Sequence, residues 1–391
     1  MAQANAILAH GGGPTAVINA SLAGLVDETR RNANIGSLFG AHFGVEGLLR
    51  GEFVDLLALS PAEARAIGAT PGSAIGSSRR KVGDEELERM LAVFRAHNVR
   101  QFFYTGGNGS MNTALRVDQF ARAAGYDLTV VGIPKTIDND LEITDHTPGY
   151  ASTARFFAHA ARDVGEDNRS LPSPICILET LGRNAGWIVA ATAFARRDED
   201  DAPHLIYLPE KRVSLDRIAN DAARTCARFG RCVIAVCEGQ LDENGQAFGA
   251  TVDRPDVAQH RLASNLGFTL ARLLTEKTGL RARAEKPGLL GRCCGPFTSE
   301  IDRREAFECG IAAARAAADG KSGQMVALRR CSTEPYVTTT FLTPLESVAL
   351  TERTMPAEWI GEDPTTMAPA FLDWARPLVG EIAFYPRVRF A

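Results

Sequence analysis

Four side chains that can do chemistry follow one predicted strand. The hydrophobic run 128–133 indicates a buried parallel strand, and Pro134 ends it because proline removes a donor from the hydrogen-bond ladder. One ammonium, one hydroxyl and two carboxylates come next, on Lys135, Thr136, Asp138 and Asp140. Carboxylates at a strand's carboxyl end can hold Mg²⁺ or accept a proton from a hydroxyl, and a lysine can neutralise phosphate. On these residues alone, a charged surface turn is the alternative.

Two glycine-rich turns each lie between a predicted strand and a predicted helix. The turn Gly11 to Gly13 joins a strand at 5–9 to an amphipathic helix at 17–31, and the turn 106–111 follows a strand at 100–105. Such turns present backbone N–H groups and the positive end of a helix to an anion. Because the pattern recurs, we expect several loops to converge on one phosphate-binding cleft of a doubly wound sheet.

Three cations, Arg79, Arg80 and Lys81, follow a turn rich in glycine and serine. They lie just before a helix predicted over 84–97, which Asp84 can cap. This position makes them candidates for a phosphate clamp, although isolated basic runs are usually solvated surface.

Two charged residues follow predicted strands in the second half of the chain. Arg183 comes after the strand predicted over 175–180, where a guanidinium can reach a bound oxyanion. Glu238 comes directly after the strand predicted over 232–237, and a glutamate at such a place commonly binds a sugar hydroxyl. A solvated loop is the alternative for Glu238.

Further strands and helices are needed to position these residues. We expect strands at 38–43, 205–208 and 325–328, and helices at 152–164, 215–229, 257–278 and 301–319. The remaining segments are a loop or short helix over 45–50, a polar loop over 165–173, and irregular packing over the last 50 or so residues. Strands that alternate with helices favour an α/β fold with a parallel sheet.

Composition limits the classes of function. The 391 residues suit two lobes, and 45% hydrophobic with 23% charged residues is typical of a soluble globular protein. A formal charge of -4 gives no electrostatic support for binding nucleic acid or an anionic membrane. We find no signal peptide and no apolar segment of the roughly 20 residues that a membrane span requires. We therefore expect a cytoplasmic protein with reduced cysteines, the adjacent pair Cys293–Cys294 being the candidate for redox activity.

Six motifs, in this order, resemble the phosphofructokinase family. They are GGPTAVINA, GSSRRK, TGGNGSM, PKTIDND, ETLGRNAGW and VCEGQ, and the match covers about Ala6 to Gly310. The resemblance implies an α/β fold of two Rossmann-like three-layer lobes with mostly parallel sheets, in a homodimer or homotetramer. It places a donor-binding lobe at 1–140, a sugar-phosphate-binding lobe at 141–310, and a C-terminal segment at 311–391 that packs back on both lobes.

The resemblance also implies a glycolytic reaction, the transfer of a phosphoryl group from diphosphate or ATP to the 1-hydroxyl of fructose 6-phosphate with Mg²⁺. The catalytic residues would be Asp138 as the base, with Lys135 and Arg183. Asp140 and Asn108 would hold the metal. The sugar-phosphate residues would be Thr136, Gly182, Glu238, Arg283 and Arg292. The donor-binding residues would be Gly12, Gly13, Arg79, Gly107, Asn108, Gly109 and Ser110.

Two positions give conflicting indications of the phosphoryl donor. The diphosphate branch of the family usually carries an acidic side chain where Gly109 stands, and the glycine leaves space for a nucleotide. Lys135, in contrast, is the diphosphate-type residue, where the common bacterial ATP enzymes have glycine. Because the stretch GGPTAVINASL also resembles the diphosphate branch, we predict diphosphate as the donor, with ATP as the alternative.

Three further departures concern the metal and the sugar. Asn108 stands where an aspartate commonly helps to hold the metal, so Asp140 would carry more of that role. Leu289 and Pro174 stand where polar or basic residues of the sugar-phosphate pocket are common. Lys286 could substitute for them, or the substrate could be another sugar phosphate such as sedoheptulose 7-phosphate.

These departures also allow a function of another class, a non-catalytic sugar-phosphate sensor. The retained Asp138 argues against a sensor, because a sensor needs no base. A dinucleotide-dependent dehydrogenase is the other α/β alternative, but the first strand is not followed by GxGxxG. We therefore favour a phosphotransferase.

Overall fold

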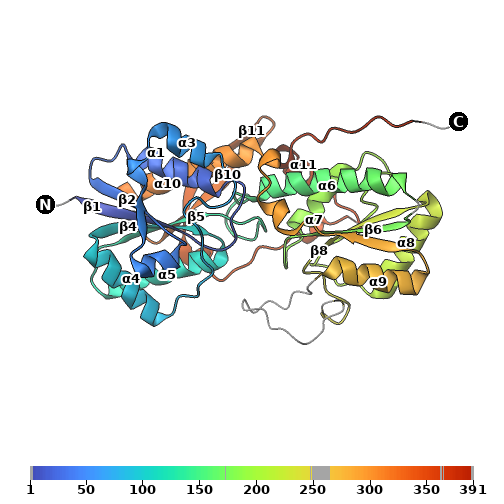
Figure 1. Cartoon of the computed structure of the whole chain (residues 1–391), viewed down its shortest axis with the longest axis horizontal. Coiled ribbons are helices and arrows are strands. Elements are labelled where there is room, and N and C mark those ends of the chain that lie inside the picture. Colours follow the sequence, from blue (N-terminus) through green and yellow to red (C-terminus); the bar gives the residue numbers. More distant parts are fainter. Residues whose placement is uncertain are drawn as a thin grey trace. The chain divides into compact units, whose positions relative to one another are not determined.

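The computed structural model describes residues 3–171, 173–246, 248, 265–361, 363 and 365–388. The chain divides into two compact units (Figure 1). Unit 1 contains residues 1–152 and 292–353, and unit 2 contains residues 153–291 and 354–391. This division differs from the predicted one. The first boundary falls after Ser152 instead of after residue 140, and residues 292–310 belong to unit 1, because the chain returns there to add two strands to the first sheet.

Unit 1 is built on a seven-stranded sheet with the order β11-β10-β5-β4-β1-β2-β3. The inner pairs are parallel, and the outermost strand on each side is antiparallel to its neighbour. The strands are β1 (Ala4–His10), β2 (Ile35–Ala41), β3 (Phe53–Asp55), β4 (Val99–Gly106), β5 (Thr129–Pro134), β10 (Gln324–Thr333) and β11 (Tyr336–Pro344).

Helices cover both faces of this sheet, which makes unit 1 a three-layer structure. Neighbouring strand residues point to opposite faces, so Phe102 packs in one core and Phe103 in the other. The first core is closed by α2 (Val45–Arg50), α4 (Asp84–Ala96) and α5 (Asn108–Ala123). The second core is closed by α1 (Ile18–Thr29), α3 (Pro61–Gly68) and α10 (Glu300–Ala318).

Unit 2 is built on a four-stranded parallel sheet with the order β7-β8-β6-β9. Its strands are β6 (Ile175–Thr180), β7 (Leu205–Tyr207), β8 (Cys232–Cys237) and β9 (Ala282–Glu285). One face packs on α8 (Leu215–Phe229) and α9 (Leu266–Thr278), and the other on α6 (Tyr150–Ser170). Unit 2 also contains α7 (Trp187–Ala191), α11 (Pro369–Val379) and the short 3₁₀ helices η2 (Thr192–Ala195), η3 (Gly288–Arg292) and η6 (Ala357–Trp359).

The predicted fold class, two mostly parallel α/β lobes, is confirmed, and several element boundaries are corrected. Helix α6 continues through the predicted polar loop to Ser170, because its polar last turns find partners: Asn168 donates to the Ser173 carbonyl at 2.7 Å, and Arg169 pairs with Asp200 at 2.7 Å. Helix α5 begins at Asn108, four residues earlier than expected. The predicted helix 257–278 is described only from Leu266, and its residues 257–264 lie outside the described residues.

The final residues are more regular than predicted. They contain β11 and α11, and α11 buries Phe371, Ala375 and Leu378 at helical spacing. Trp374 of α11 lies 5.3 Å from Trp187 and 5.1 Å from Trp359 between ring centroids. This aromatic cluster explains how a segment with a proline inside its helix is held on unit 2.

The predicted cap of α4 is also wrong. The N-cap is Gly83, whose N–H donates to the Glu86 carboxylate at 2.8 Å, and Asp84 instead accepts from Arg116 at 2.7 Å.

Among the described residues, no helix combines the length and the apolar character that crossing a membrane requires.

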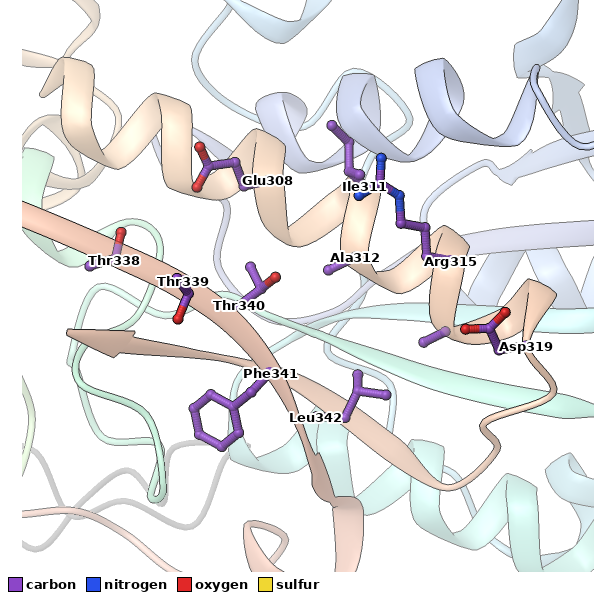
Figure 2. Close-up of a pocket in the computed structure, with 11 residues that line it drawn as sticks. Glu308, Ile311, Ala312, Arg315, Asp319, Thr338, Thr339, Thr340, Phe341 and Leu342 are labelled. Atoms are coloured by element: carbon purple, nitrogen blue, oxygen red, sulfur yellow. The ribbon is translucent and has the colours of Figure 1, made fainter. Parts of the chain in front are cut away.

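A surface groove of about 550 Å³ lies in unit 1 between α10 and β11 (Figure 2). Glu308, Ile311, Ala312 and Arg315 line it from the helix, and residues 338–342 line it from the strand. None of the predicted site residues lines this groove, so it is separate from the candidate active site.

The close packing of α1 on α10 gives a first prediction. A Cβ added at Gly310 would overlap the backbone oxygen of Ser21 and lie 2.7 Å from the Leu25 nitrogen, and backbone cannot move aside cheaply. We expect Gly310→Ala to lower the free energy of unfolding by about 2–3 kcal/mol, measured by urea denaturation. The control is Gly109→Ala, where the added Cβ meets nothing within 4 Å. A Gly310→Ala protein as stable as wild type would contradict the close approach.

Candidate active site

The carboxyl ends of β1, β4 and β5 meet at one edge of the unit 1 sheet. His10 pairs with Thr105, and Gly106 pairs with Pro134. The glycine turn after β1, the glycine turn after β4 and the lysine stretch after β5 therefore lie together, as the sequence predicted. The Lys135 backbone N–H donates to the Gly106 carbonyl at 3.0 Å, which ties the second and third segments to each other.

Lys135 joins the third segment to the first. Its side chain is buried, and Nζ donates to the carbonyl oxygens of Gly11 at 2.9 Å and Gly13 at 2.6 Å. These two bonds replace part of the hydration that a buried ammonium loses. The ammonium is thereby fixed on the glycine turn.

Two arginines reach the same turn. A Cβ placed on Gly13 would lie 2.9 Å from Arg292 Nη1 and 3.6 Å from Arg79 Nη2, and one placed on Gly12 would lie 3.5 Å from Lys135 Nζ. Three cations thus converge on two residues that have no side chains. Gly12 has a φ of +76°, which other residues rarely adopt, so the turn needs glycine for its conformation as well as for space.

Burial and the neighbouring positive charges lower the pKa of Lys135 and of His10. Burial, opposed by Asp138 and reinforced by Arg292, lowers the pKa of Lys135 to about 8. Burial and the nearby Lys135 lower the pKa of His10 to about 3, so this histidine is neutral. A bound anion would relieve the repulsion between Lys135 and Arg292, which favours a phosphate ligand at this turn.

Two serines directly before Arg79 hold the glycine turn in shape, one through its hydroxyl and one through its backbone carbonyl. Ser77 Oγ donates to the Gly12 carbonyl at 2.7 Å, and the Gly12 N–H donates to the Ser78 carbonyl at 2.9 Å. Sequence analysis gave Ser77 and Ser78 no role, although their position directly before Arg79 was a usable signal. Arg80, a predicted clamp residue, is instead paired with Glu86 at 3.0 Å and with Glu46 at 3.3 Å.

The two carboxylates lie on a tight turn after Lys135. Asp138 is partly buried, and its N–H donates to Thr136 Oγ1 at 3.1 Å, so the threonine hydroxyl is used within the turn. Asn139, between the two acids, has a φ of +55° and accepts from the Thr147 N–H at 3.0 Å. Sequence analysis missed this anchoring role of Asn139.

Asp140 contacts the start of α5. Asn108 Nδ2 donates to Asp140 Oδ2 at 3.1 Å and to the Asp140 backbone oxygen at 3.2 Å. Asn108 Oδ1 is buried and has no hydrogen-bond partner among the described residues. An oxygen in that position beside a carboxylate suits a hard cation such as Mg²⁺. In the described part of the chain, no three His, Cys, Asp or Glu side chains form a metal cluster, so a cation here would need oxygens from a ligand as well.

The remaining residues of the second turn differ in what surrounds them. Gly107 caps α5 without a side-chain bond, and its missing Cβ would lie 3.5 Å from Thr136 Cβ. A Cβ on Gly109 would meet nothing within 4 Å, so open space remains there. Ser110 is buried, packs against Gly11 and Gly106 and bonds the Tyr104 hydroxyl. This places the Ser110 side chain as a support for the glycine turns.

Unit 2 carries its own group of polar residues at the carboxyl ends of β6 and β8. The Glu238 N–H donates to the Thr180 carbonyl at 3.0 Å, which fixes the glutamate at this edge. Burial raises the pKa of Glu238, opposed by Lys286, while the nearby Glu179 raises it further. Lys286, named as a substitute sugar-phosphate ligand, pairs with the buried Glu179 at 2.7 Å.

Gly182 and Arg183 form the turn that faces Glu238. Gly182 has a φ of +130° and Arg183 a φ of +52°, which is uncommon for a residue with a side chain. The backbone of Arg183 hydrogen-bonds the Glu238 carboxylate, and its guanidinium lowers the pKa of that group. The predicted pair Arg183 and Glu238 is therefore brought together within unit 2.

Two predicted sugar-phosphate arginines lie in different places. Arg292 belongs to unit 1, beside Gly13 and Arg79. Arg283 lies on β9 opposite Cys176, four residues before the end of β6, and pairs with Asp167. At about 3.3 Å per residue this is roughly 13 Å from the edge that carries Glu238. The structure does not bring Arg283 and Glu238 together within unit 2.

A cation-lined glycine turn beside carboxylates, on a doubly wound sheet, is the arrangement that phosphoryl-transfer enzymes require. Residues 5–317 match the family described as Phosphofructokinase. The chain is 38% identical over 387 residues to the pyrophosphate–fructose 6-phosphate 1-phosphotransferase of Rhodospirillum rubrum, covering 97% of this chain and 95% of that protein. The chain belongs to the phosphofructokinase family, which confirms the predicted resemblance.

Other known proteins agree with this assignment. The pyrophosphate–fructose 6-phosphate 1-phosphotransferase of Halomonas elongata is 38% identical over 374 residues, covering 93% of this chain and 88% of that protein. The crystal structure of a pyrophosphate-dependent phosphofructokinase from Nitrosospira multiformis superposes with a TM-score of 0.89 at 32% identity, covering 99% of this chain and 94% of that one.

The lowered pKa of Lys135 gives a second prediction. As pH rises through about 8, Lys135 in the free protein loses its proton and with it the charge that attracts an anion. We expect the calorimetric affinity for diphosphate to fall about tenfold from pH 7 to pH 9 because of Lys135. Diphosphate itself also changes its ionisation over this range, and Lys135→Met measures that contribution alone. The variant should bind diphosphate more weakly than wild type at pH 7 and should lack the part of the fall that Lys135 causes. Identical pH profiles for the two proteins would contradict the assignment.

Proposed function

We propose that this chain transfers a phosphoryl group from diphosphate to the 1-hydroxyl of fructose 6-phosphate. The observation that carries the proposal is the convergence of Lys135, Arg79 and Arg292 on the glycine turn at Gly12 and Gly13. Three cations on a turn without side chains match the charge and the small size of diphosphate. The printed names of the similar proteins support the same substrate pair.

Asp138 is the proposed base. It accepts the proton of the sugar's 1-hydroxyl as that oxygen bonds to the nearer phosphorus atom, while the bond from that phosphorus to the bridging oxygen breaks. Orthophosphate leaves with the bridging oxygen, and Lys135 with Arg292 neutralises the charge that develops on it. Such a reaction needs positioning and charge stabilisation more than covalent chemistry.

Mg²⁺ is the proposed metal, held by Asp140 and Asn108. The buried Oδ1 of Asn108 and the adjacent carboxylate fit a hard cation, and oxygens of diphosphate would supply further ligands. The ion would neutralise negative charge on the donor. The donor residues Gly107, Gly109 and Ser110 shape this side of the site.

The proposed sugar-phosphate residues come mainly from unit 2. Arg183 stabilises charge on the transferring group. Glu238 binds the sugar's hydroxyls, and Gly182 gives the backbone turn beside it. Thr136 keeps its proposed contact with the sugar or the transferring group. Arg283 has the support of the family resemblance alone. We further propose that the reaction serves glycolysis in the cytoplasm and that the enzyme is a homodimer or homotetramer.

The role of Asp138 gives a third prediction. Asp138→Asn removes the base and keeps the size of the side chain, so kcat with fructose 6-phosphate, Mg²⁺ and diphosphate should fall by roughly 10²- to 10⁴-fold. Diphosphate should still bind in calorimetry, because the Arg79 and Arg292 guanidinium groups are intact. Turnover by Asp138→Asn at the wild-type rate would refute the base. Wild-type turnover with ATP alone would refute the donor.

ATP is the second candidate donor, and the open space at Gly109 is the observation that favours it. This gives a fourth prediction. Gly109→Asp is sterically tolerated and places a carboxylate in the first turn of α5, where the helix dipole stabilises it. We expect the variant to keep diphosphate turnover within about threefold while any ATP turnover falls at least tenfold, as steady-state assays with each donor would show. An ATP rate unaffected by Gly109→Asp would contradict nucleotide exclusion at this position.

A further inference from the structure

The turn that carries Asp138 and Asp140 is held by the residues that follow it. The Thr147 N–H donates to Asn139 Oδ1 at 3.0 Å, and Thr147 Oγ1 donates to the Thr136 carbonyl at 2.8 Å. Thr136 also forms an isolated parallel bridge with Gly149. The position of the two carboxylates therefore depends on where this return segment, residues 144–149, is fixed.

His146 is the buried centre of the return segment. Its side chain is 0% exposed, and its two ring nitrogens face two different carboxylates. Nδ1 lies 2.8 Å from Asp145 Oδ2, and Nε2 lies 2.6 Å from Glu305 Oε2 on α10. A neutral imidazole has one N–H and would set its other nitrogen's lone pair against a carboxylate oxygen. The geometry thus favours the doubly protonated imidazolium between two carboxylates.

Each carboxylate is held by further donors. Glu305 Oε1 accepts from Tyr336 at 2.8 Å and from Thr338 at 2.6 Å, and both donors lie on β11. Asp145 Oδ2 accepts from Arg330 on β10 at 3.0 Å. The return segment is thereby tied to α10 and to the β10–β11 hairpin, beside the groove that Thr338 lines (Figure 2).

The surrounding charges favour the imidazolium. Burial lowers the pKa of His146, but Glu305 and Asp145 outweigh it and raise that pKa to about 9. The elements packed against His146, Asp145 and Glu305 bring further charged or titratable groups to these three residues, namely Asp302, Glu308, Cys309, Arg330, Tyr336 and Arg353. Asp302 itself receives N–H bonds from Gly149 at 2.8 Å and Ser152 at 2.9 Å, which fixes the far end of the segment.

We propose that His146, as an imidazolium held between Asp145 and Glu305, is a positioning residue that fixes the turn bearing Asp138 and Asp140. The catalytic effect rests on the proposed function, since it acts through Asp138. Removing the imidazolium leaves the Lys135, Arg79 and Arg292 cluster intact. The loss should therefore appear in kcat and leave the affinity for diphosphate unchanged.

The first test compares His146→Gln with wild type in the diphosphate assay. We expect kcat to fall about 10- to 100-fold, the range for a displaced catalytic group, with the calorimetric affinity for diphosphate within about twofold. The matched control is His204→Gln, which removes a buried, neutral histidine of unit 2 that accepts from the Val233 N–H at 2.9 Å. The control should keep kcat per folded molecule. Equal kcat in His146→Gln and wild type, or equal losses in both variants, would overturn the proposal.

The second test uses Glu305→Gln, so it does not depend on whether His146→Gln folds. Glu305→Gln keeps the shape of the side chain and can donate an amide N–H to a neutral His146, while its oxygen still accepts from Tyr336 and Thr338. In wild type at pH 8, NMR of the His146 ring should show two protonated nitrogens, and in Glu305→Gln it should show one. Glu305→Gln should also lower kcat at least fivefold and speed amide exchange in residues 138–149. A neutral His146 ring in wild type, or unchanged amide exchange in Glu305→Gln, would overturn the proposed positioning role of His146.

These readouts separate the inference from the proposed function. If wild-type protein does not turn over diphosphate, the proposed function fails, and ring protonation with amide exchange still decides whether His146 positions the turn. If wild type turns over diphosphate and neither variant changes kcat, the positioning role of His146 fails and the proposed function stands.

Discussion

The site depends on a buried ammonium. Taking the Lys135 charge out of water costs several kcal/mol unless polar groups replace the hydration. Two carbonyl oxygens of the glycine turn do so in part, and Asp138 and Asp140 add electrostatic stabilisation. Because Arg79 and Arg292 beside the turn repel the Lys135 ammonium, positive charge in the free site is only partly neutralised. A polyanionic ligand would remove that conflict, which is the physical reason for the phosphate affinity that we propose at this sheet edge.

This requirement explains the residue types around Lys135. The turn after β1 uses glycine so that three cations can approach its backbone, and β4 ends at Gly106, where an added Cβ would overlap the Ser110 hydroxyl of α5. The acids need a separate support, because a carboxylate that is free to swing toward Lys135 would pair with it and could not act as the proposed base. Asn139 and the segment around His146 supply that support from the other side of the turn.

Much of this fold could be predicted from local patterns. Helix α8 and strand β8 have the predicted bounds, because Ser214 and Gly230 cap a strongly amphipathic helix and the strand is a short, fully buried apolar run. The start of α5 could not be predicted, because asparagine and glycine are poor helix formers and tertiary contacts decide there. Strand β10 was predicted over 325–328 alone, and β11 and α11 were missed. For α11 the reason is related, since Trp374 packs on Trp187, which is distant in sequence.

The individual residues of the candidate site could be predicted more fully than the contacts that join them. Lys135 and the glycine turn were each identified, but the bonds between them join residues more than 120 positions apart, which no local pattern reports. Arg292 shows the same limit. The family resemblance gave it a sugar-phosphate role, while the structure places it with Arg79 beside Gly13. His146 had a sequence signal, a histidine beside an aspartate just after PKTIDND, whose meaning depended on the distant Glu305.

The most direct measurement is a crystal structure of the protein with diphosphate and Mg²⁺. If the cation-lined turn is the donor site, phosphate oxygens will lie within about 3 Å of Lys135 Nζ and of the Arg79 and Arg292 guanidinium groups, over Gly12 and Gly13. Diphosphate bound elsewhere, with Lys135 still bonded only to Gly11 and Gly13, would contradict this claim.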